Sequence, residues 1–362
     1  MNKSRLIILK LRRVWIITAA LIICGCEVTG QETQDEISPL TLMTWNIHNL
    51  FDGNDDGNEY DEFLQSSGWS SEKYLGRLNS IAEAVKKIEP LPDIIMFQEI
   101  ESRRILDDIA AFVHQDFMWS HFAGNPGSAI GLGIISRVPL IEAKSHSITI
   151  GNETTPRPVL ETRVQTASGG FIIFTCHWKS KIGGDDVTEN IRRSSARVIL
   201  RRVREIWENE PETGIIIAGD LNENFNEFYR QSSGYICALL PDDPYSVTLA
   251  NIGEEKQMDY IVVTGAVPPE PVHFPDETIV FYSPWANEIP DGSYFYKYNW
   301  ETIDHFLVSH QFFNDSGWEY NNTYAANFEP FTNAQGFPVS YNSRTGYGLS
   351  DHLPLLISLI WK

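Results

Sequence analysis

Polar residues that could bind a metal ion or transfer a proton stand at the ends of otherwise apolar segments. Each has a side chain that accepts or donates hydrogen bonds, and each follows, interrupts or precedes a run of apolar residues. One such residue is normally bonded to nearby backbone, but a repeated pattern indicates a common site. If these segment ends converge, they form a pocket of carboxylates, amides and two imidazoles. The residues are Asn46, Glu99, His177, Asp220, Asn222, Asp304, Asp351 and His352.

Glu99 and Asn46 offer hard oxygen ligands without thiolates. Such ligands suit Mg²⁺, with Mn²⁺ as the alternative, and either ion would also bind an oxygen of a substrate phosphate. A zinc hydrolase built from His177, Asp220 and His352 is the rival, but the sequence has no local His-x-x-x-His or cysteine-pair spacing to support it.

The remaining polar residues supply proton transfer. Asp220 can accept a proton from an attacking water or orient that water. Asn222 can donate to a phosphoryl oxygen. Asp304 can fix the tautomer of His352, and a cationic His352 can donate to the phosphoryl group as negative charge builds up. With the metal ion, this set predicts in-line hydrolysis of a phosphate ester.

Strand and helix patterns alternate along the chain and must position these residues. Several strands are joined directly, as in VLETRVQTASGGFIIFTC, which excludes a purely parallel sheet and favours an α/β sandwich of mixed sheets. Most of residues 240–300 is expected to form long loops, with only MDYIVVTG strand-like. The predicted helices span residues 71–88, 101–113 and 188–209. The predicted strands span residues 40–47, 92–100, 131–139, 159–166, 170–178, 214–223, 302–309 and 352–361.

The N-terminal residues 1–25 are typical of a secretory signal, with basic residues around the apolar stretch from Val14 to Ile23. Gly25 before Cys26 suits a bacterial lipoprotein signal that leaves Cys26 acylated; the alternatives are an ordinary cleaved signal or an uncleaved anchor. Residues 26–39 are an acidic tether and residues 40–362 the folded domain. We therefore expect an exported protein, anchored in the membrane by a lipid and facing the periplasm or the cell exterior, with no protein partner implied.

Acidic residues dominate the charge. The chain has 28 Lys and Arg against 48 Asp and Glu, and removal of residues 1–25 leaves 23 basic residues, a net charge of −25. This balance argues against tight, non-specific binding of nucleic acid, but a site with local positive potential can still act on a phosphate ester. Cys176 and Cys237 could pair in an oxidising compartment or remain buried thiols.

The motifs TWNIHNLF, IIMFQEI, FTCHWKS, IAGDLNE, TIDHFLVS and LSDHLPL occur in this order over residues 41–361. Together they resemble the endonuclease/exonuclease/phosphatase superfamily of pancreatic-type deoxyribonucleases and apurinic endonucleases, and GSYFYKYNWETID is similar to an exported bacterial branch. The resemblance implies a four-layer sandwich of two mixed β-sheets flanked by helices. His48 stands where some apurinic endonucleases have an acidic residue, which argues against a second metal ion and a role in DNA repair.

The same resemblance implies roles for individual residues. It assigns metal binding to Glu99 and Asn46, with Asp351 as a further candidate. It assigns water activation to Asp220, phosphate contact to Asn222 and His177, and a paired Asp304–His352 dyad.

Two further positions are candidates for substrate binding. Lys179, with Lys181 two residues on, could attract a phosphate or be a solvated loop charge. Trp300 ends the alternating series Tyr294, Tyr296 and Tyr298, on which bases or rings could stack; the alternative is the packed face of a strand. The arginines of residues 192–204 are either a solvated, paired helix face or a patch that meets a nucleic-acid backbone.

We therefore expect a Mg²⁺-dependent phosphoesterase that cleaves phosphodiester bonds, and nuclease activity is the first candidate. A phosphatase or phosphodiesterase acting on a small soluble or lipid-derived phosphate ester is the alternative enzyme. A non-catalytic surface binding lipoprotein with the same fold is the alternative of another class.

Overall fold

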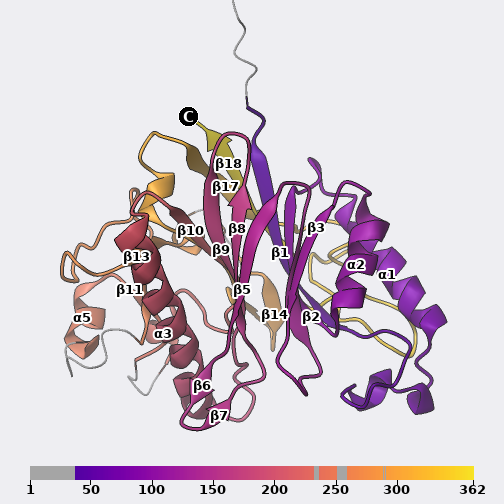
Figure 1. Ribbon diagram of the computed structural model, residues 1–362. Helices are drawn as coiled ribbons and strands as arrows, with labels where there is room; N and C mark the ends of the chain where they lie inside the picture. The colour runs from indigo at the N-terminus through magenta and orange to yellow at the C-terminus, as the bar shows by residue number, and fades with distance from the viewer. Residues whose placement is uncertain (1–36, 232–235, 251–258, 288, 290) are drawn as a thin grey trace, which may run out of the picture. The chain divides into compact units, whose positions relative to one another are not determined.

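Two β-sheets pack face to face in the computed structural model, which describes residues 37–362 except 232–235, 251–258, 288 and 290 (Figure 1). One sheet has six strands in the order β17-β18-β1-β2-β4-β3. The strands are β1 (Leu40–Leu50), β2 (Ile94–Ile100), β3 (Trp119–Ala123), β4 (Gly131–Ser136), β17 (Trp318–Ala325) and β18 (Leu355–Trp361).

The second sheet has eight strands in the order β11-β12-β13-β16-β10-β9-β8-β5. The strands are β5 (Leu140–His146), β8 (Val159–Gln165), β9 (Gly170–His177), β10 (Gly214–Asp220), β11 (Leu239–Pro241), β12 (Ile261–Thr264), β13 (Val280–Tyr282) and β16 (Asp304–Val308). Two small hairpins are separate from both sheets: β6 (Thr149–Ile150) with β7 (Glu153–Thr154), and β14 (Tyr294–Tyr296) with β15 (Asn299–Glu301).

Helices cover the outer faces of the two sheets. Helices α1 (Ser71–Val85) and α2 (Arg103–Val113) lie beside the six-stranded sheet, and the long α3 (Asp185–Asn209) lies beside the eight-stranded one (Figure 1). Two short helices, α4 (Glu227–Arg230) and α5 (Pro244–Ala250), follow β10 and β11. Both sheets mix parallel pairs, such as β1–β2 and β9–β10, with antiparallel ones. The predicted four-layer sandwich of mixed sheets is therefore confirmed.

Alternation along the strands separates the hydrophobic clusters. Leu42 of β1 packs between the two sheets, whereas its neighbour Met43 packs under α1 and α2, because successive strand residues point to opposite faces. A third cluster joins the eight-stranded sheet to α3 through residues such as Ile217 and Ile199. Burial of each such aliphatic side chain contributes roughly 1.5–3 kcal/mol to the stability of the fold. Packing on both faces of each sheet therefore holds the strand ends in fixed positions.

Several predicted elements differ from the observed ones. The sequence patterns missed β3, β5 and β17. Residues 240–300 contain the expected strand in MDYIVVTG, which is β12, but also α5, β13 and β14, with β11 and β15 at the two ends of the stretch. β5 and β17 carry exposed polar residues along much of their length and have a strand on one side only, so they lack the apolar runs used for prediction. The predicted last strand begins at Leu355 and not at residue 352, which leaves Asp351 and His352 in the preceding loop.

The predicted signal segment, Cys26 and most of the tether lie outside the described residues, and their roles stay predictions. Among the described residues, no helix combines the length and apolarity that crossing a membrane requires. Cys176 and Cys237 are both buried and belong to different hydrophobic clusters.

Candidate active site

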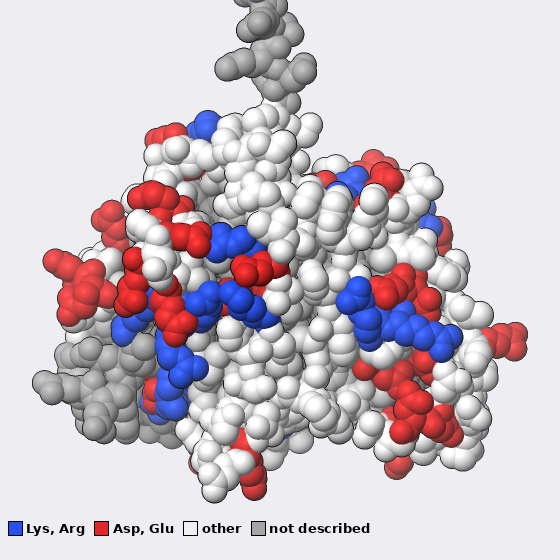
Figure 2. Space-filling model, in the orientation of Figure 1, with Lys and Arg blue, Asp and Glu red and all other residues white. Residues whose placement is uncertain are grey.

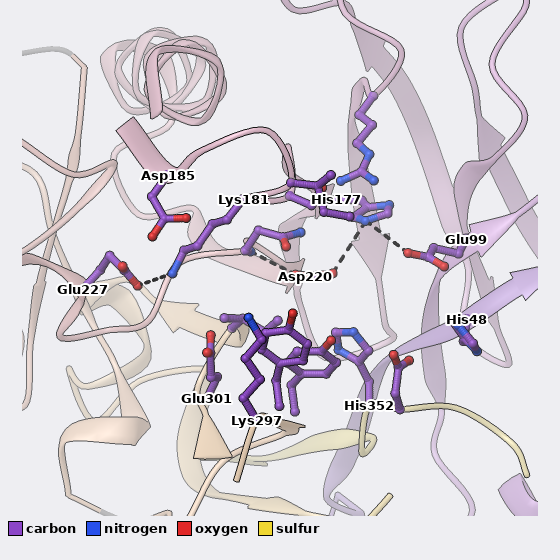
Figure 3. Close-up of a pocket in the computed structure, with 18 of the residues that line it drawn as sticks. His48, Glu99, His177, Lys181, Asp185, Asp220, Glu227, Lys297, Glu301 and His352 are labelled. Carbon is purple, nitrogen blue, oxygen red and sulfur yellow. Dashed lines mark hydrogen bonds and ion pairs between the residues drawn. The ribbon is translucent and has the colours of Figure 1, made fainter. Parts of the chain in front are cut away.

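A cavity of about 910 Å³ opens where strand ends of both sheets meet. Glu99, His177, Asp220, Asp351 and His352 all line it. In Figure 3, Glu99 and His48 lie at one end of this pocket, and Lys181, Asp185, Glu227, Lys297 and Glu301 lie at the other. The predicted convergence of polar strand ends therefore occurs.

Glu99 faces the pocket because β2 bulges at this residue. The pairing of β2 with β4 shifts between Gln98 and Ile100, and Glu99 has a φ of 64°. A left-handed backbone is unfavourable for a non-glycine residue and costs about 1–3 kcal/mol. The bulge redirects a side chain that a regular strand would place otherwise.

Asn46 of β1 links two carboxylates. Its Nδ2 donates to Glu99 Oε1 at 3.1 Å and to Asp220 Oδ2 at 3.0 Å, and its Oδ1 accepts from the backbone N–H of His48 at 3.0 Å. The amide thus presents its nitrogen to the carboxylates, and its oxygen is engaged elsewhere. In this arrangement the residue orients Glu99 and Asp220, and its role as a metal ligand stays a prediction.

Asp220 and His177 are neighbours because β9 and β10 pair in parallel with these two residues in register. His177 Nε2 lies 3.6 Å from both Glu99 Oε1 and Asp220 Oδ2. Burial and the neighbouring Asp304 carboxylate raise the pKa of Asp220 to about 7. Burial, followed by the positive charge of Arg157, lowers the pKa of His177 well below its usual range. His177 is therefore neutral beside two carboxylates.

Asp304 and His352 form the predicted dyad, with His352 Nδ1 at 2.8 Å from Asp304 Oδ2. Burial of the His352 imidazole opposes its charged form, but the negative charges of Asp304 and Asp220 outweigh burial and raise its pKa to about 10. Two tryptophans anchor the backbone of the dyad: Trp45 Nε1 donates to the carbonyl of His352 and Trp285 Nε1 to that of Asp304.

Asn222 lines the pocket, directly after the strand that carries Asp220. Its backbone N–H donates to Asp220 Oδ1 at 2.9 Å, and its Nδ2 donates to the carbonyl of Trp178 at 3.1 Å. Its φ of 51° is left-handed. One of its two amide hydrogens is therefore engaged, and its phosphate contact stays a prediction.

Neither predicted substrate-binding residue lines the pocket. Lys179 Nζ bonds to Ser180 Oγ and to the carbonyl of Ile182, and it is Lys181 that reaches the pocket, where it pairs with Glu227 at 2.6 Å. Trp300 packs on Phe295 and Phe337. Trp300 is therefore part of a packed aromatic cluster, which corrects the expectation that it contacts substrate.

Arg157 and Tyr294 both line the pocket, and sequence reasoning missed Arg157. The Arg157 guanidinium donates to the carbonyl of Trp178, and among the described residues no carboxylate forms an ion pair with it. A single arginine between two prolines, in the segment PRP, gave no spacing signal. Tyr294 belongs to an alternating aromatic series whose role the sequence left open.

A divalent metal fits the oxygens in this pocket. The buried Oδ1 of Asp351 has no hydrogen-bond partner among the described residues, and the Glu99 carboxylate lines the same pocket. Ligand atoms of Asp220, Asp304 and His352 lie within 4.8 Å of one another, but the Asp304–His352 hydrogen bond occupies two of these groups. Glu99 and Asp351 are the better candidates, because they offer the carboxylate oxygens that hard cations prefer and neither takes part in the Asp304–His352 hydrogen bond.

The sequence and the fold match known proteins. The model of the endonuclease/exonuclease/phosphatase family matches residues 41–233. A Bacteroides thetaiotaomicron protein of this family has the same fold, with 14% identity, a TM-score of 0.51 and coverage of 90% of this chain and 98% of that one. No curated protein sequence gives a significant match.

Two further solved structures share the fold. TDP2 of D. rerio, complexed with a single-strand DNA product, has 12% identity and a TM-score of 0.51, and the match covers 89% of this chain and 99% of that one. The mannosyl-6-phosphatase of Bacteroides thetaiotaomicron has 15% identity, a TM-score of 0.50 and coverage of 89% and 100%. At these identities the likeness is one of fold.

Proposed function

The chain belongs to the endonuclease/exonuclease/phosphatase family and is a divalent-metal-dependent hydrolase of phosphate esters, and from this premise we propose a Mg²⁺-dependent reaction by in-line attack of water in the pocket described above. One observation carries the proposal: the Asp220 carboxylate shares one pocket with the imidazole of His352, which is hydrogen-bonded to Asp304, and with the oxygens of Glu99 and Asp351.

Glu99 and Asp351 would hold the metal ion, which when bound neutralises charge on a phosphoryl oxygen and orients the ester. Asp220 accepts a proton from the attacking water, since a base is most effective when its pKa is near the working pH. Asn46 keeps this carboxylate and Glu99 in place, and His177, whose Nε2 lies 3.6 Å from both carboxylates, would contact the phosphate.

His352 and Arg157 stabilise the charge that develops on the phosphoryl group. His352 donates from its Nε2 because its Nδ1 is bonded to Asp304, and Asp304 stabilises the cationic ring. Arg157 adds a positive charge that no carboxylate pairs with among the described residues. Donors already aimed at the developing charge need no reorganisation during the reaction.

Two substrate classes remain as candidates, and nuclease activity is the first. The sequence motifs favour it, and a structure of the same fold is complexed with a DNA product. A local positive charge at Arg157 would offset the acidic character of the chain at the scissile phosphate.

A compact phosphate ester with a hydroxylated leaving group is the second candidate, and the far end of the pocket favours it. Three cations, Lys181, Arg230 and Lys297, line the pocket with three carboxylates, Asp185, Glu227 and Glu301. Lys181 is already paired with Glu227, and the Arg230 guanidinium donates to the carbonyl of Trp300. In Figure 3, Asp185 lies near Lys181, and Lys297 lies near Glu301. The carboxylates could accept hydrogen bonds from hydroxyls, which supports an ester such as the sugar phosphate that the name of one fold neighbour indicates.

Removal of the base or of the imidazole tests the reaction. Asp220→Asn and His352→Ala should each lower kcat on a chromogenic phosphodiester by at least ~10², and a chelator should stop the wild-type enzyme until Mg²⁺ is restored. Asp116→Asn and His114→Ala are matched controls at exposed positions and should leave kcat unchanged. Full turnover in excess chelator, or wild-type kcat in both site variants, would refute the proposal.

A substrate panel separates the two classes. Wild-type protein would be assayed with plasmid DNA, RNA, bis-p-nitrophenyl phosphate, p-nitrophenyl phosphate and a hexose 6-phosphate. A kcat/KM that is highest for DNA or RNA supports the nuclease. A kcat/KM that is highest for the hexose phosphate supports the second class.

A further inference from the structure

The Asp304–His352 dyad is assembled from both sheets. Asp304 is the first residue of β16 in the eight-stranded sheet, and His352 lies just before β18 in the six-stranded sheet. Their hydrogen bond is 2.8 Å long, a geometry that even a small slip between the two sheets would break. A third element must therefore keep the dyad aligned.

Ser293, directly before β14, contacts both sides of the dyad. Its Oγ donates to Asp304 Oδ2 at 2.6 Å, and its backbone carbonyl accepts from the N–H of Leu353 at 2.7 Å. The side chain is fully buried, and its own N–H donates to the carbonyl of Glu301 at 3.0 Å. One residue thus ties Asp304, the segment after His352 and the β14–β15 hairpin together.

Tyr294, the next residue, packs against the imidazole itself. The backbones of Tyr294 and His352 form an antiparallel bridge, and their ring centroids lie 4.6 Å apart with planes 30° apart. Tyr296 stacks on Tyr294 at 6.0 Å and 16°, and Lys297 Nζ lies 4.9 Å from the centre of the Tyr296 ring. His352 is therefore the innermost member of a stack, so its ring cannot turn freely.

We propose that Ser293 and Tyr294 are positioning residues for the dyad: Ser293 fixes the Asp304 carboxylate, and the ring of Tyr294 fixes the His352 imidazole. Neither residue needs to touch the reacting atoms. The inference rests on the proposed function only in that turnover is one of its readouts. Ser293 and Tyr294 together form a brace for the dyad. A misplacement of a catalytic group by about 1 Å can lower a rate by ~10², so removal of either part of this brace should lower kcat.

Two variants of Tyr294 separate the ring from the hydroxyl. Tyr294→Ala should lower kcat by ~10-fold or more with little change in KM, and Tyr294→Phe should keep the wild-type kcat because it keeps the stack. Tyr298→Ala, on the same hairpin but 94% exposed, is the control and should be neutral. Equal losses of kcat in Tyr294→Phe and Tyr294→Ala would overturn the role of the ring.

Ser293→Ala removes the donor to Asp304 with minimal change in volume and should lower kcat by ~10-fold. Ser283→Ala is the matched control, because Ser283 is 1% exposed and its Oγ has no hydrogen-bond partner among the described residues. Wild-type kcat in Ser293→Ala would overturn the role of Ser293.

Proton NMR supplies a readout independent of turnover. The deshielded proton on His352 Nδ1, assigned by its absence in His352→Ala, should be present in wild type and Tyr294→Phe and lost or broadened in Tyr294→Ala. An unchanged signal in Tyr294→Ala would overturn the brace even if the enzyme were inactive. A wild-type protein without Mg²⁺-dependent turnover would instead refute the proposed function and leave the NMR test of the brace standing.

Discussion

Left-handed backbone conformations concentrate around the pocket. Among the described residues, seven other than glycine have positive φ, and five of them line the cavity: His48, Asn49, Glu99, Asn222 and Lys297. Each costs about 1–3 kcal/mol, which the packed sheets must offset. Conformations of this kind aim side chains where a regular strand would not, so the fold gives up stability to form the site.

Gly219, the residue before Asp220, also has a positive φ. Its φ is 129°, and a Cβ there would lie 2.0 Å from the carbonyl oxygen of Cys176, an atom held in the β9–β10 ladder. Gly219→Ala should lower the free energy of unfolding by at least about 2 kcal/mol, measured by urea denaturation.

Gly76→Ala is the matched control for that prediction. Gly76 lies within α1, and a Cβ there would meet no atom within 4 Å. The change should stabilise the protein by roughly 0.5–1 kcal/mol, because alanine loses less conformational freedom than glycine in a helix. A neutral Gly219→Ala would show that the strand accommodates a side chain beside the active site.

At the scale of elements, α3 is fixed to the active-site loops by a buried arginine. Arg192 is fully buried and donates to Glu223 at 2.5 Å and to Glu189 at 2.7 Å. It also donates to the backbone carbonyls of Lys179 and Asp185. One guanidinium thus holds the loop before α3 against the segment that follows Asn222.

Arg192→Ala should therefore destabilise the protein by about 3–5 kcal/mol, because it leaves two buried carboxylates without a cation. Arg201→Ala, at an exposed position of the same helix, should stay within about 0.5 kcal/mol of wild type. Thermal or urea unfolding of both variants checks this. A loss below 1 kcal/mol in Arg192→Ala, on the order of one ordinary hydrogen bond, would contradict the assigned role.

At the scale of the whole molecule, charge separates the two alternatives left open for the basic helix. Arg193 and Arg197 pair with Asp259, and Arg202 pairs with Glu161 and Glu205. Blue and red atoms accordingly interleave over α3 in Figure 2. This face is mostly paired, but the exposed Arg201 and Arg204 form no ion pair among the described residues, so it offers two uncompensated positive charges rather than a continuous basic patch.

The net charge of −20 leads to a prediction about salt. If DNA is a substrate, its kcat/KM should rise as NaCl is increased at fixed free Mg²⁺, because screening weakens repulsion between two polyanions. The kcat/KM for a small phosphate ester should change less. A steep fall for DNA, as expected of proteins that bind phosphates with many cations, would indicate a basic binding surface that the charge count hides.

Much of the fold and part of the site could be predicted from the sequence, because strand periodicity and the types of polar residue are local properties. Glu99, Asp220 and the Asp304–His352 dyad follow from polar residues at the ends of apolar runs. Edge strands such as β17 escaped because exposed polar residues interrupt their pattern. Lys179 and Trp300 were misplaced because a sequence pattern does not say which residues of a loop or hairpin face the cavity.

The sequence by itself determined which chemical groups are present and that they stand at strand ends. Only the tertiary structure decided which of them meet: Asn46 and Asp220 bond across 174 positions of the chain, and Arg157 joined the site without any signal in the sequence. The reason is physical. Burial, register and ring packing depend on atoms far apart along the chain, so the orientation of Asn46 and the brace on His352 exist only once both sheets are packed together.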